Sequence, residues 1–484
     1  MNDFIKKQLN DFDDKAFIHA LKVFIIIAFL VIGYGFIYSG FQIVDEFEHL
    51  HASWLVSEGK LPYRDFFEHH HPLLWYISAP LVSVFYDDVS IFYVMRLISA
   101  GVSAVTLFFM YRIALFFTDK KGGLLMVAIA LCNIITIYNF YQFRPDGWMN
   151  LFFIIGVYHL FCYIKKPLIK NIIISFCCFS LSLLFLQKIG LMLGVIEGVL
   201  IWLILKKQIK LKQAIIAAIP AVLIVGIFLL SFVKNGTILE YFALNFRFNQ
   251  ALVYYFERGA FWRPNLIFRI YGLGVLFSIY FFRKENIYFK IIAILYIAEF
   301  LMRGFYFAPH PNYYTLLIIL FALVISVSSK EIMPKYKGIS IAVIMGLFLM
   351  LGVCFNNLVE TSEKHNAFRH YELAKFVHEN SNDNDVIMNG YDKNFNIYRN
   401  DASYYWFGLD MLIPVMEQEF GVKNLIDINQ VIITQKPKFV YTKNYVDLRA
   451  LRMYGETKYS QIHIPQIINQ LYTETPFNNL VILK

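Results

Sequence analysis

The chain has 484 residues, of which 58% are hydrophobic and 16% charged, and its mean hydropathy is +0.53. Apolar runs this long and this numerous exclude a soluble globular protein and indicate a polytopic α-helical membrane protein. The net charge of +9 does not indicate a nucleic-acid partner, because the basic residues form short clusters between apolar segments, the pattern that sets membrane orientation. The five cysteines all lie in apolar runs, so we expect neither a disulfide framework nor a cysteine metal site.

The first apolar run follows a polar N-terminal segment. Residues 1–20 are too polar and too acidic for a signal peptide, and they carry lysines that favour the cytoplasmic side. Residues 21–41 are therefore predicted to form a membrane helix that is retained and that delivers the following residues to the extracytoplasmic side.

The loop after this helix, from Val44 to Pro72, has a high density of ionisable groups. Such a segment cannot lie in hydrocarbon, so it is predicted to face water at the membrane surface. Residues 45–57 form a surface helix in this interpretation, which ends before Gly59 and Pro62. The apolar residues that recur at helical spacing within it are Phe47, Leu50, Trp54 and Leu55.

Residues 72–86 are apolar but short, and Pro80 interrupts them. If this segment crossed the bilayer, Lys120 and Lys121 would lie on the extracytoplasmic side. If it stays at the surface or re-enters, every basic cluster falls on the cytoplasmic side. We favour the second interpretation, because lysine and arginine bias is the better guide to orientation.

The remaining apolar runs predict ten further spans, which makes about eleven and at most thirteen transmembrane helices. Between two of them, residues 234–265 read as another amphipathic surface helix. The predicted spans are residues 90–117, 123–139, 148–164, 172–187, 190–206, 214–233, 266–282, 288–305, 312–329 and 338–355.

The composition becomes polar and mixed near Asn356. We therefore divide the chain into a transmembrane domain, residues 1–355, whose first extracytoplasmic loop is 42–89, and an extracytoplasmic soluble domain, residues 356–484. A helical stretch at 365–380 opens the tail. Strand-like runs at Val386–Met388, Gln430–Thr434 and Phe439–Thr442 then predict α/β or α+β packing.

Several charged residues fall on the predicted extracytoplasmic side. Asp45 and Glu46 head the first loop, and two adjacent carboxylates at an interface are costly enough to suggest a function, although acids also mark non-cytoplasmic helix ends. Arg144 and Asp146 flank a proline in a second loop, where a phosphate contact and a snorkelling base are equally plausible. Lys188 interrupts an apolar run against the orientation rule, so a lipid phosphate or a headgroup would be its partner.

Two further groups are weaker candidates. Arg303 and His310 lie in the last loop on the same side and could close the same cavity. The adjacent histidines His69, His70 and His71 raise the question of zinc, but three consecutive side chains cannot all reach one metal from regular structure.

Together these motifs resemble the GT-C superfamily of polyprenyl-phosphate-sugar-dependent glycosyltransferases. That superfamily includes protein O-mannosyltransferases, lipid A aminoarabinose transferases and RgtA/B/C/D-like enzymes. The resemblance extends to about residue 330, and the tail is similar only in its position. The motifs that carry it are DEFEHLHASWLVSEGKLPYRDFFEHHHPLLWY after the first span, FRPDGW, and QKIG.

The resemblance implies that Asp45 is the catalytic acidic residue, with Glu46 beside it, and that Asp146 is a second carboxylate facing the same cavity. Glu68 stands at the place of a glutamate that binds metal in some relatives, so a divalent metal held by Glu68 and His71 is one option, and no cofactor is certain. A lysine of those relatives is replaced here by His69. The expected donor phosphate contacts are Arg144, Lys188, Arg303, His310 and His69.

The expected partners are a polyprenyl-phosphate-linked sugar donor, an envelope glycan or lipid acceptor, and membrane lipids, in a bacterial inner membrane with the active site facing the periplasm. A carboxylate base would deprotonate the acceptor hydroxyl, and fixed cations would stabilise the departing phosphate, so that one displacement inverts the anomeric carbon. A lipid-linked sugar flippase or transporter and an O-antigen ligase remain the alternatives. The sugar, the acceptor and the oligomeric state are not readable from the residues.

Overall fold

The computed structural model describes residues 14–255, 266–303, 314–332, 337–389, 394–407, 412, 415–416, 419–422, 427–442 and 464–484. The chain divides into two compact units. We call the first, formed by Met1–Phe41, Arg96–Leu230 and Phe256–His365, the helical unit. The second, formed by Gln42–Met95, Ser231–Tyr255 and Asn366–Lys484, is called the loop unit.

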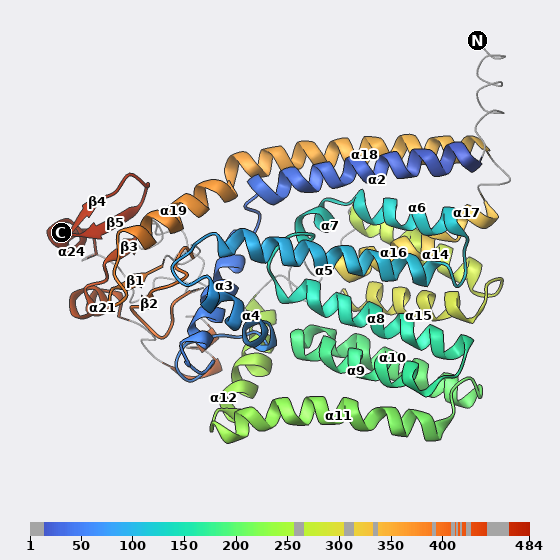
Figure 1. The fold of residues 1–484 in the computed structure, drawn as a ribbon, viewed down its shortest axis with the longest axis horizontal. Helices are drawn as coiled ribbons and strands as arrows, with labels where there is room; N and C mark the ends of the chain where they lie inside the picture. Colours follow the sequence, from blue (N-terminus) through green and yellow to red (C-terminus); the bar gives the residue numbers. More distant parts are fainter. Residues whose placement is uncertain are drawn as a thin grey trace, which may run out of the picture. The chain divides into compact units, whose positions relative to one another are not determined.

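The helical unit contains the long apolar helices, and two of them, α2 and α18, lie side by side (Figure 1). Their outward faces are rich in exposed leucine, isoleucine and phenylalanine, as expected for side chains that meet lipid. Among the described residues, six helices are long and apolar enough to cross a membrane. They are α2 (Asp14–Tyr38), α5 (Ile91–Ala114), α8 (Pro145–Lys165), α10 with the preceding turn (Gln187–Leu205), α11 (Leu211–Lys234) and α18 (Lys337–Lys364).

The other predicted spans correspond to shorter helices, so the count of eleven to thirteen stays a prediction. The run at 123–139 is broken at Cys132, because Asn133 caps a new helix by accepting a hydrogen bond from the Ile135 N–H at 2.9 Å. These shorter helices are α6 (Lys120–Leu131), α7 (Ile134–Asn139), α9 (Ile169–Phe185), α14 (Leu266–Phe282), α15 (Ile287–Met302), α16 (Thr315–Ser326) and α17 (Ser328–Glu331).

A buried arginine holds the C-terminal end of α2. Arg96 of α5 is fully buried and donates to the carbonyl oxygens of Phe36 at 2.7 Å and Ser39 at 3.0 Å. The amide of Gln142 donates to the carbonyl oxygen of Phe41. These contacts satisfy carbonyls that a helix end leaves without partners, and so they define where the first loop begins.

The loop unit contains the first loop, in which two helices pack on each other. α3 (Ile43–Ser57) confirms the helix predicted at residues 45–57, which begins two residues earlier than expected. Its position at the membrane surface stays a prediction. α4 (Leu73–Val84) has 12 residues and contains Pro80. At 1.5 Å per residue it is roughly 18 Å long, shorter than the hydrocarbon core, which agrees with the surface interpretation of residues 72–86. Residues 238–255 follow as α12 (Ile238–Phe242), the π-helical turn η2 (Ala243–Phe248) and α13 (Asn249–Tyr255).

The tail in this unit carries a five-stranded sheet of order β2-β1-β3-β5-β4, in which β1 is parallel to β2 and β3 and the other pairs are antiparallel. Alternate residues face opposite sides: Ile387 and Phe439 pack under α19, while Met388 and Val440 pack under α21 and α24. The elements are α19 (Ala367–Glu379), β1 (Val386–Met388), β2 (Asn400–Asp401), α21 (Ile428–Gln435), β3 (Phe439–Tyr441), α24 (Ile464–Leu471), β4 (Tyr472–Glu474) and β5 (Leu480–Leu483).

Two of the three predicted strands are confirmed as β1 and β3, and the third is wrong. Residues 430–434 lie in α21, because the Asp427 carboxylate accepts a hydrogen bond from the Gln430 N–H at 3.0 Å and starts a helix. The buried face of that helix, at Ile432, then packs on the sheet. β-Branched residues favoured a strand, and tertiary packing overrode that local preference.

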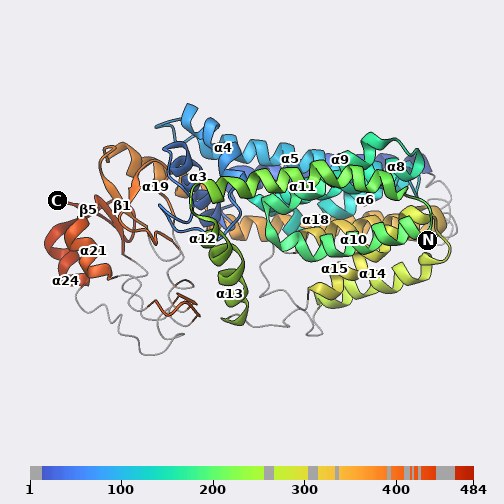
Figure 2. The same ribbon diagram turned by 90° about the horizontal axis from the view of Figure 1, so that it is seen from below.

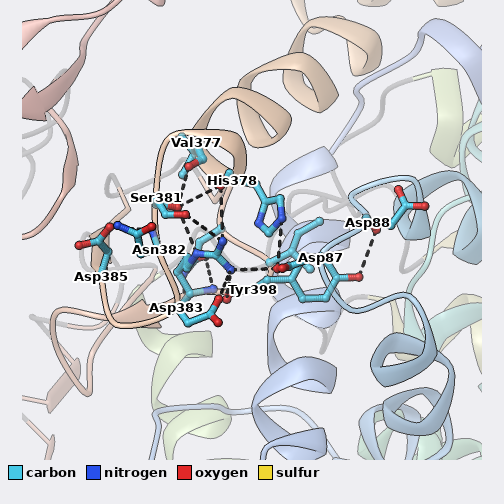
Figure 3. Close-up of polar contacts among 12 residues, drawn as sticks. Asp87, Asp88, Val377, His378, Ser381, Asn382, Asp383, Asp385 and Tyr398 are labelled. Atoms are coloured by element: carbon cyan, nitrogen blue, oxygen red, sulfur yellow. Dashed lines mark hydrogen bonds and ion pairs between the residues drawn. The ribbon is translucent and has the colours of Figure 1, made fainter.

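Arg399 ties the tail to the connection that follows α4, where Asp87 meets His378 of the tail (Figure 3). It is buried, and its guanidinium lies 3.2 Å from Asp87 and 3.4 Å from Asp383. It also donates to Ser381 Oγ at 3.1 Å. His378 at the end of α19 lies 3.2 Å from the same Asp87 carboxylate. We call Asp87, His378, Asp383 and Arg399 the Arg399 cluster.

Candidate functional site

The first turn of α3 carries the predicted catalytic pair. Gln42, before the helix, adopts a left-handed conformation with φ 51°, which turns the chain from α2 into α3. Asp45 is half-buried and Glu46 is fully buried. A helix N-terminus favours the ionised form of carboxylates in its first turn. Because Glu46 is buried and Asp45 is only partly so, Asp45 is the carboxylate of the two that solvent or a ligand can reach.

Further along the first loop, His70 lies between two buried glutamates. Its Nδ1 is 3.2 Å from a carboxylate oxygen of Glu48 and 3.4 Å from one of Glu68. Burial, reinforced by the neighbouring Glu68, raises the pKa of Glu48 to about 7. Burial alone would lower the pKa of His70, but its contacts with both glutamates raise it to about 10. His70 is therefore an imidazolium that balances part of the buried negative charge.

The neighbouring histidines point to different partners. His69 Nδ1 lies 2.8 Å from the Asn249 side-chain oxygen, and the Asn249 amide donates to the His69 carbonyl oxygen at 2.7 Å. Burial, together with the charge on His70, holds the pKa of His69 well below its usual range, so this ring is neutral. His71 Nε2 lies 3.5 Å from the Tyr241 hydroxyl. A neutral His69 offers a phosphate one N–H group, and not the charge of a lysine.

The metal predicted at Glu68 and His71 can be tested against this geometry. Among the described residues, the group with atoms close enough to share an ion is Glu48, His49 and His70, all within 4.8 Å, and it includes neither predicted ligand. His49 Nδ1 accepts the indole N–H of Trp75 at 3.2 Å, which places the ring proton on Nε2 and leaves no lone pair for a metal. His70 Nδ1 is already paired with carboxylate oxygens of Glu48 and Glu68. Glu48, His49 and His70 therefore do not fit a metal ion; the metal at Glu68 and His71 stays a prediction, and no step below involves one.

A second charged cluster lies in the helical unit, at the N-terminus of α8. Arg144 is the N-cap residue and Pro145 the first helical residue, a position that suits proline because no N–H is needed there. Asp146 follows and forms an ion pair with Lys188, and its other oxygen lies 3.4 Å from Arg144 Nε. All three side chains are at least four-fifths buried.

Arg303, at the end of α15, joins this cluster through its charge. It forms an ion pair with Glu299 one turn earlier, and both side chains are buried. Lys188 interacts electrostatically with Arg144 and with Arg303. We call these five residues the cation cluster: three cations, Arg144, Lys188 and Arg303, face two carboxylates, Asp146 and Glu299. Cations gathered at one place meet the electrostatic requirement of an anion site.

Asp146 also lines a cavity inside the helical unit. The cavity contains about 480 Å³ of space not filled by protein atoms, part of which is open solvent. Five helices supply its walls. The lining residues are Ser103, Thr106, Leu107, Met110, Ala130, Thr136, Asn139, Phe140, Asp146, Gly147, Asn150, Thr315 and Ile319.

The predicted site residues thus fall into two groups, one in each unit. Asp45, Glu46, Glu68, His69 and His71 belong to the loop unit. The helical unit holds Arg144, Asp146, Lys188 and Arg303. His310 lies outside the described residues. Sequence reasoning assigned no role to Glu48, His70 or Glu299. The sequence did carry a signal for Glu299. It is an acid inside an apolar run, four residues before Arg303, which is the spacing of an ion pair within a helix.

Comparisons with known proteins address the fold. No family model matches the chain, and no curated protein does. A solved structure does match, and it shows that this chain shares the fold of that structure, with six helices among the described residues long and apolar enough to cross a membrane. That structure is ArnT from Cupriavidus metallidurans in the apo state. It aligns with a TM-score of 0.55 over 78% of this chain and 83% of that chain, at 12% sequence identity.

Proposed function

We propose that this protein is an inverting glycosyltransferase that moves a single sugar from a polyprenyl-phosphate carrier to a cell-envelope glycan or lipid, such as O-antigen or lipopolysaccharide. The transfer takes place at the periplasmic face of a bacterial inner membrane. The observation that carries the proposal is that Asp146 belongs both to the cation cluster and to the lining of a cavity inside the helical unit. Three cations grouped beside such a cavity, in a chain with long apolar helices, suit a lipid-linked anion.

Arg144 and Lys188 are the residues we assign to the donor phosphate. Both now face Asp146, so a phosphate would share or take over contacts that the carboxylate makes. The N–H groups at the start of α8 add a favourable dipole for an anion. As the glycosidic bond breaks, negative charge gathers on the departing phosphate, and cations that are already positioned stabilise it without reorganisation.

Asp45 is the residue we assign as general base. Asp146 is a poor candidate for that role, because it already forms an ion pair with Lys188 and lies beside Arg144. Glu46 is buried, whereas Asp45 is half-buried at the start of α3 and can meet an acceptor hydroxyl. One direct displacement by that hydroxyl inverts the anomeric carbon and needs no glycosyl-enzyme intermediate.

The proposal is tested with purified protein reconstituted with defined polyprenyl-phosphate sugars and an envelope glycan acceptor. We expect transfer of one sugar per acceptor with inversion, and loss of the corresponding sugar from the envelope glycans of a deletion strain. Movement of the intact lipid-linked sugar across vesicles, without transfer, would instead identify a flippase. Transfer of a whole oligosaccharide from a pyrophosphate-linked donor would identify a ligase.

A further inference from the structure

The cavity beside the cation cluster has walls of two chemical kinds. Leu107, Met110, Phe140 and Ile319 supply apolar surface. Six further lining residues carry hydroxyl or amide groups. Such groups are uncommon inside an apolar helical unit, because each needs a hydrogen-bond partner there. The six residues are Ser103, Thr106, Thr136, Asn139, Asn150 and Thr315.

Part of this polar wall is already satisfied within the protein. Thr106 donates its hydroxyl to the Val102 carbonyl oxygen at 2.9 Å. The Asn139 amide donates to Thr315 Oγ1 at 2.7 Å. These groups need nothing from a ligand.

Two side chains in the wall are different. Asn150 is 3% exposed and Thr136 is 8% exposed, and neither the Asn150 amide oxygen nor the Thr136 hydroxyl has a hydrogen-bond partner among the described residues. Asn150 lies four residues after Asp146 on α8, so both side chains occupy one helix face, with Asn150 one turn deeper. Thr136 lines the same cavity, so both side chains belong to the cavity wall that includes Asp146 of the cation cluster.

Both parts of a lipid-linked sugar flank its phosphate, so either could enter this cavity. An isoprenoid chain has no hydrogen-bonding groups and would leave Asn150 and Thr136 buried without partners. A sugar ring presents hydroxyl donors to the amide oxygen and to the threonine hydroxyl, while its C–H faces meet the apolar wall. Satisfying buried polar groups is what distinguishes a site built for a hydroxylated ligand.

We propose that this cavity binds the sugar of the polyprenyl-phosphate donor, with Asn150 and Thr136 hydrogen-bonded to its hydroxyl groups. The inference rests on the proposed function, because the cation cluster must hold the phosphate at the cavity for the sugar to enter it. It assigns to Asn150 and Thr136 a role in recognising the sugar, distinct from phosphate binding by Arg144 and Lys188.

The test compares two ligands that differ only in the sugar. Binding of undecaprenyl phosphate, and of undecaprenyl phosphate carrying glucose, galactose or mannose, is measured on the full-length protein in nanodiscs. Wild type should bind at least one of the three sugar lipids more tightly than the bare lipid. Asn150→Leu and Thr136→Val remove the polar groups at nearly constant size, and each should weaken that sugar lipid about three- to tenfold while leaving the bare lipid unchanged. Thr106→Val is the matched control and should change neither, because its hydroxyl is already used.

Each other outcome overturns the assignment. Equal loss for both lipids would mean that the cavity holds the isoprenoid chain or only supports the fold. A thermal melt of each variant with bare lipid bound separates those two causes. No loss for either lipid, or no gain in affinity from any sugar in wild type, would mean that the cavity is filled by water. If wild type binds none of these lipids, the proposed donor class itself is wrong and the sugar site is wrong with it.

Discussion

Two carboxylates predicted to share one cavity have different surroundings. Asp146 lies between Lys188 and Arg144, which makes it a counter-ion for the cations that we assign to phosphate. Asp45 is half-buried at a helix start, where a carboxylate can still exchange a proton with a bound hydroxyl. Their sequence contexts look alike, an acid next to a membrane helix end. The chemistry that we assign to each follows from its neighbours.

Replacing Asp45 with asparagine should abolish sugar transfer. Loss of a general base typically lowers turnover by about 10²–10⁴-fold, while an interfacial charge contributes little to stability, so expression and detergent behaviour should stay near normal. Asp65→Asn, in the same loop but paired with Arg64 at the surface, is the control and should retain activity. If Asp45→Asn keeps more than about a tenth of wild-type turnover, Asp45 is not the base.

Arg144→Ala and Lys188→Ala should weaken use of the donor and leave the acceptor constant nearly unchanged. Losing a charge-assisted contact costs about 1.5–3 kcal/mol, or roughly ten- to 150-fold. Arg144→Lys should rescue only partly, because lysine cannot hold two phosphate oxygens at once. The measurement is steady-state kinetics with donor and acceptor varied separately, and the exposed Lys170→Ala serves as the control. A change confined to the acceptor constant would reverse the assignment of the site.

Among the elements, the tail and the first loop are joined within one compact unit. His51 of α3 contacts the tail through both ring nitrogens. Nε2 lies 2.6 Å from an Asp401 carboxylate oxygen, and Nδ1 lies 2.9 Å from the Ile397 carbonyl oxygen. The Arg399 cluster makes a second link, to the connection after α4 (Figure 3). A sheet with helices on both faces thus supports the loop that carries Asp45 (Figure 2).

Arg399→Leu should loosen this link without unfolding the long helices. The change removes a buried cation that makes several hydrogen bonds, and substitutions of this kind cost about 1–3 kcal/mol. Limited proteolysis should therefore cut the tail faster in the variant. Lys375→Ala, which removes an exposed pair with Glu379, should leave the rate unchanged. Equal protease resistance in Arg399→Leu and wild type would show that the cluster adds no stability.

The same cluster predicts how the tail responds to acid. Burial, and then the nearby Arg399, lower the pKa of His378 below its usual value, while Asp87 and Asp383 oppose that shift. A histidine whose pKa is lower in the folded state contributes stability above its unfolded pKa of about 6.5, and this is lost as the pH falls toward the folded value. Protease resistance of the tail should thus drop between pH 7 and 5 more in wild type than in His378→Gln. Identical profiles would exclude His378 as the titrating group.

For the whole molecule, the distribution of basic residues predicts one orientation. Asp45, Arg144, Lys188, His310 and the tail should lie on the extracytoplasmic side, and Lys120, Lys165, Lys206 and Lys284 on the other. The short α4, which has 12 residues and contains Pro80, is compatible with this orientation. Single cysteines at positions 120 and 146 should react with an impermeant reagent from opposite sides. Labelling of both from the same side would mean that residues 72–86 cross the membrane.

The sequence alone determined the long apolar helices of a membrane protein, the helix that begins near Asp45 and two strands of the tail. Hydropathy, charge bias and helical spacing are properties of neighbouring residues, so they can be read along the chain. Only the tertiary structure decided that Lys188 pairs with Asp146, 42 residues earlier, that His70 lies between Glu48 and Glu68, and that residues 430–434 form a helix. It also decided which polar groups of the cavity lack partners. Burial and pairing join residues that are distant in sequence, and a local pattern carries no signal of them.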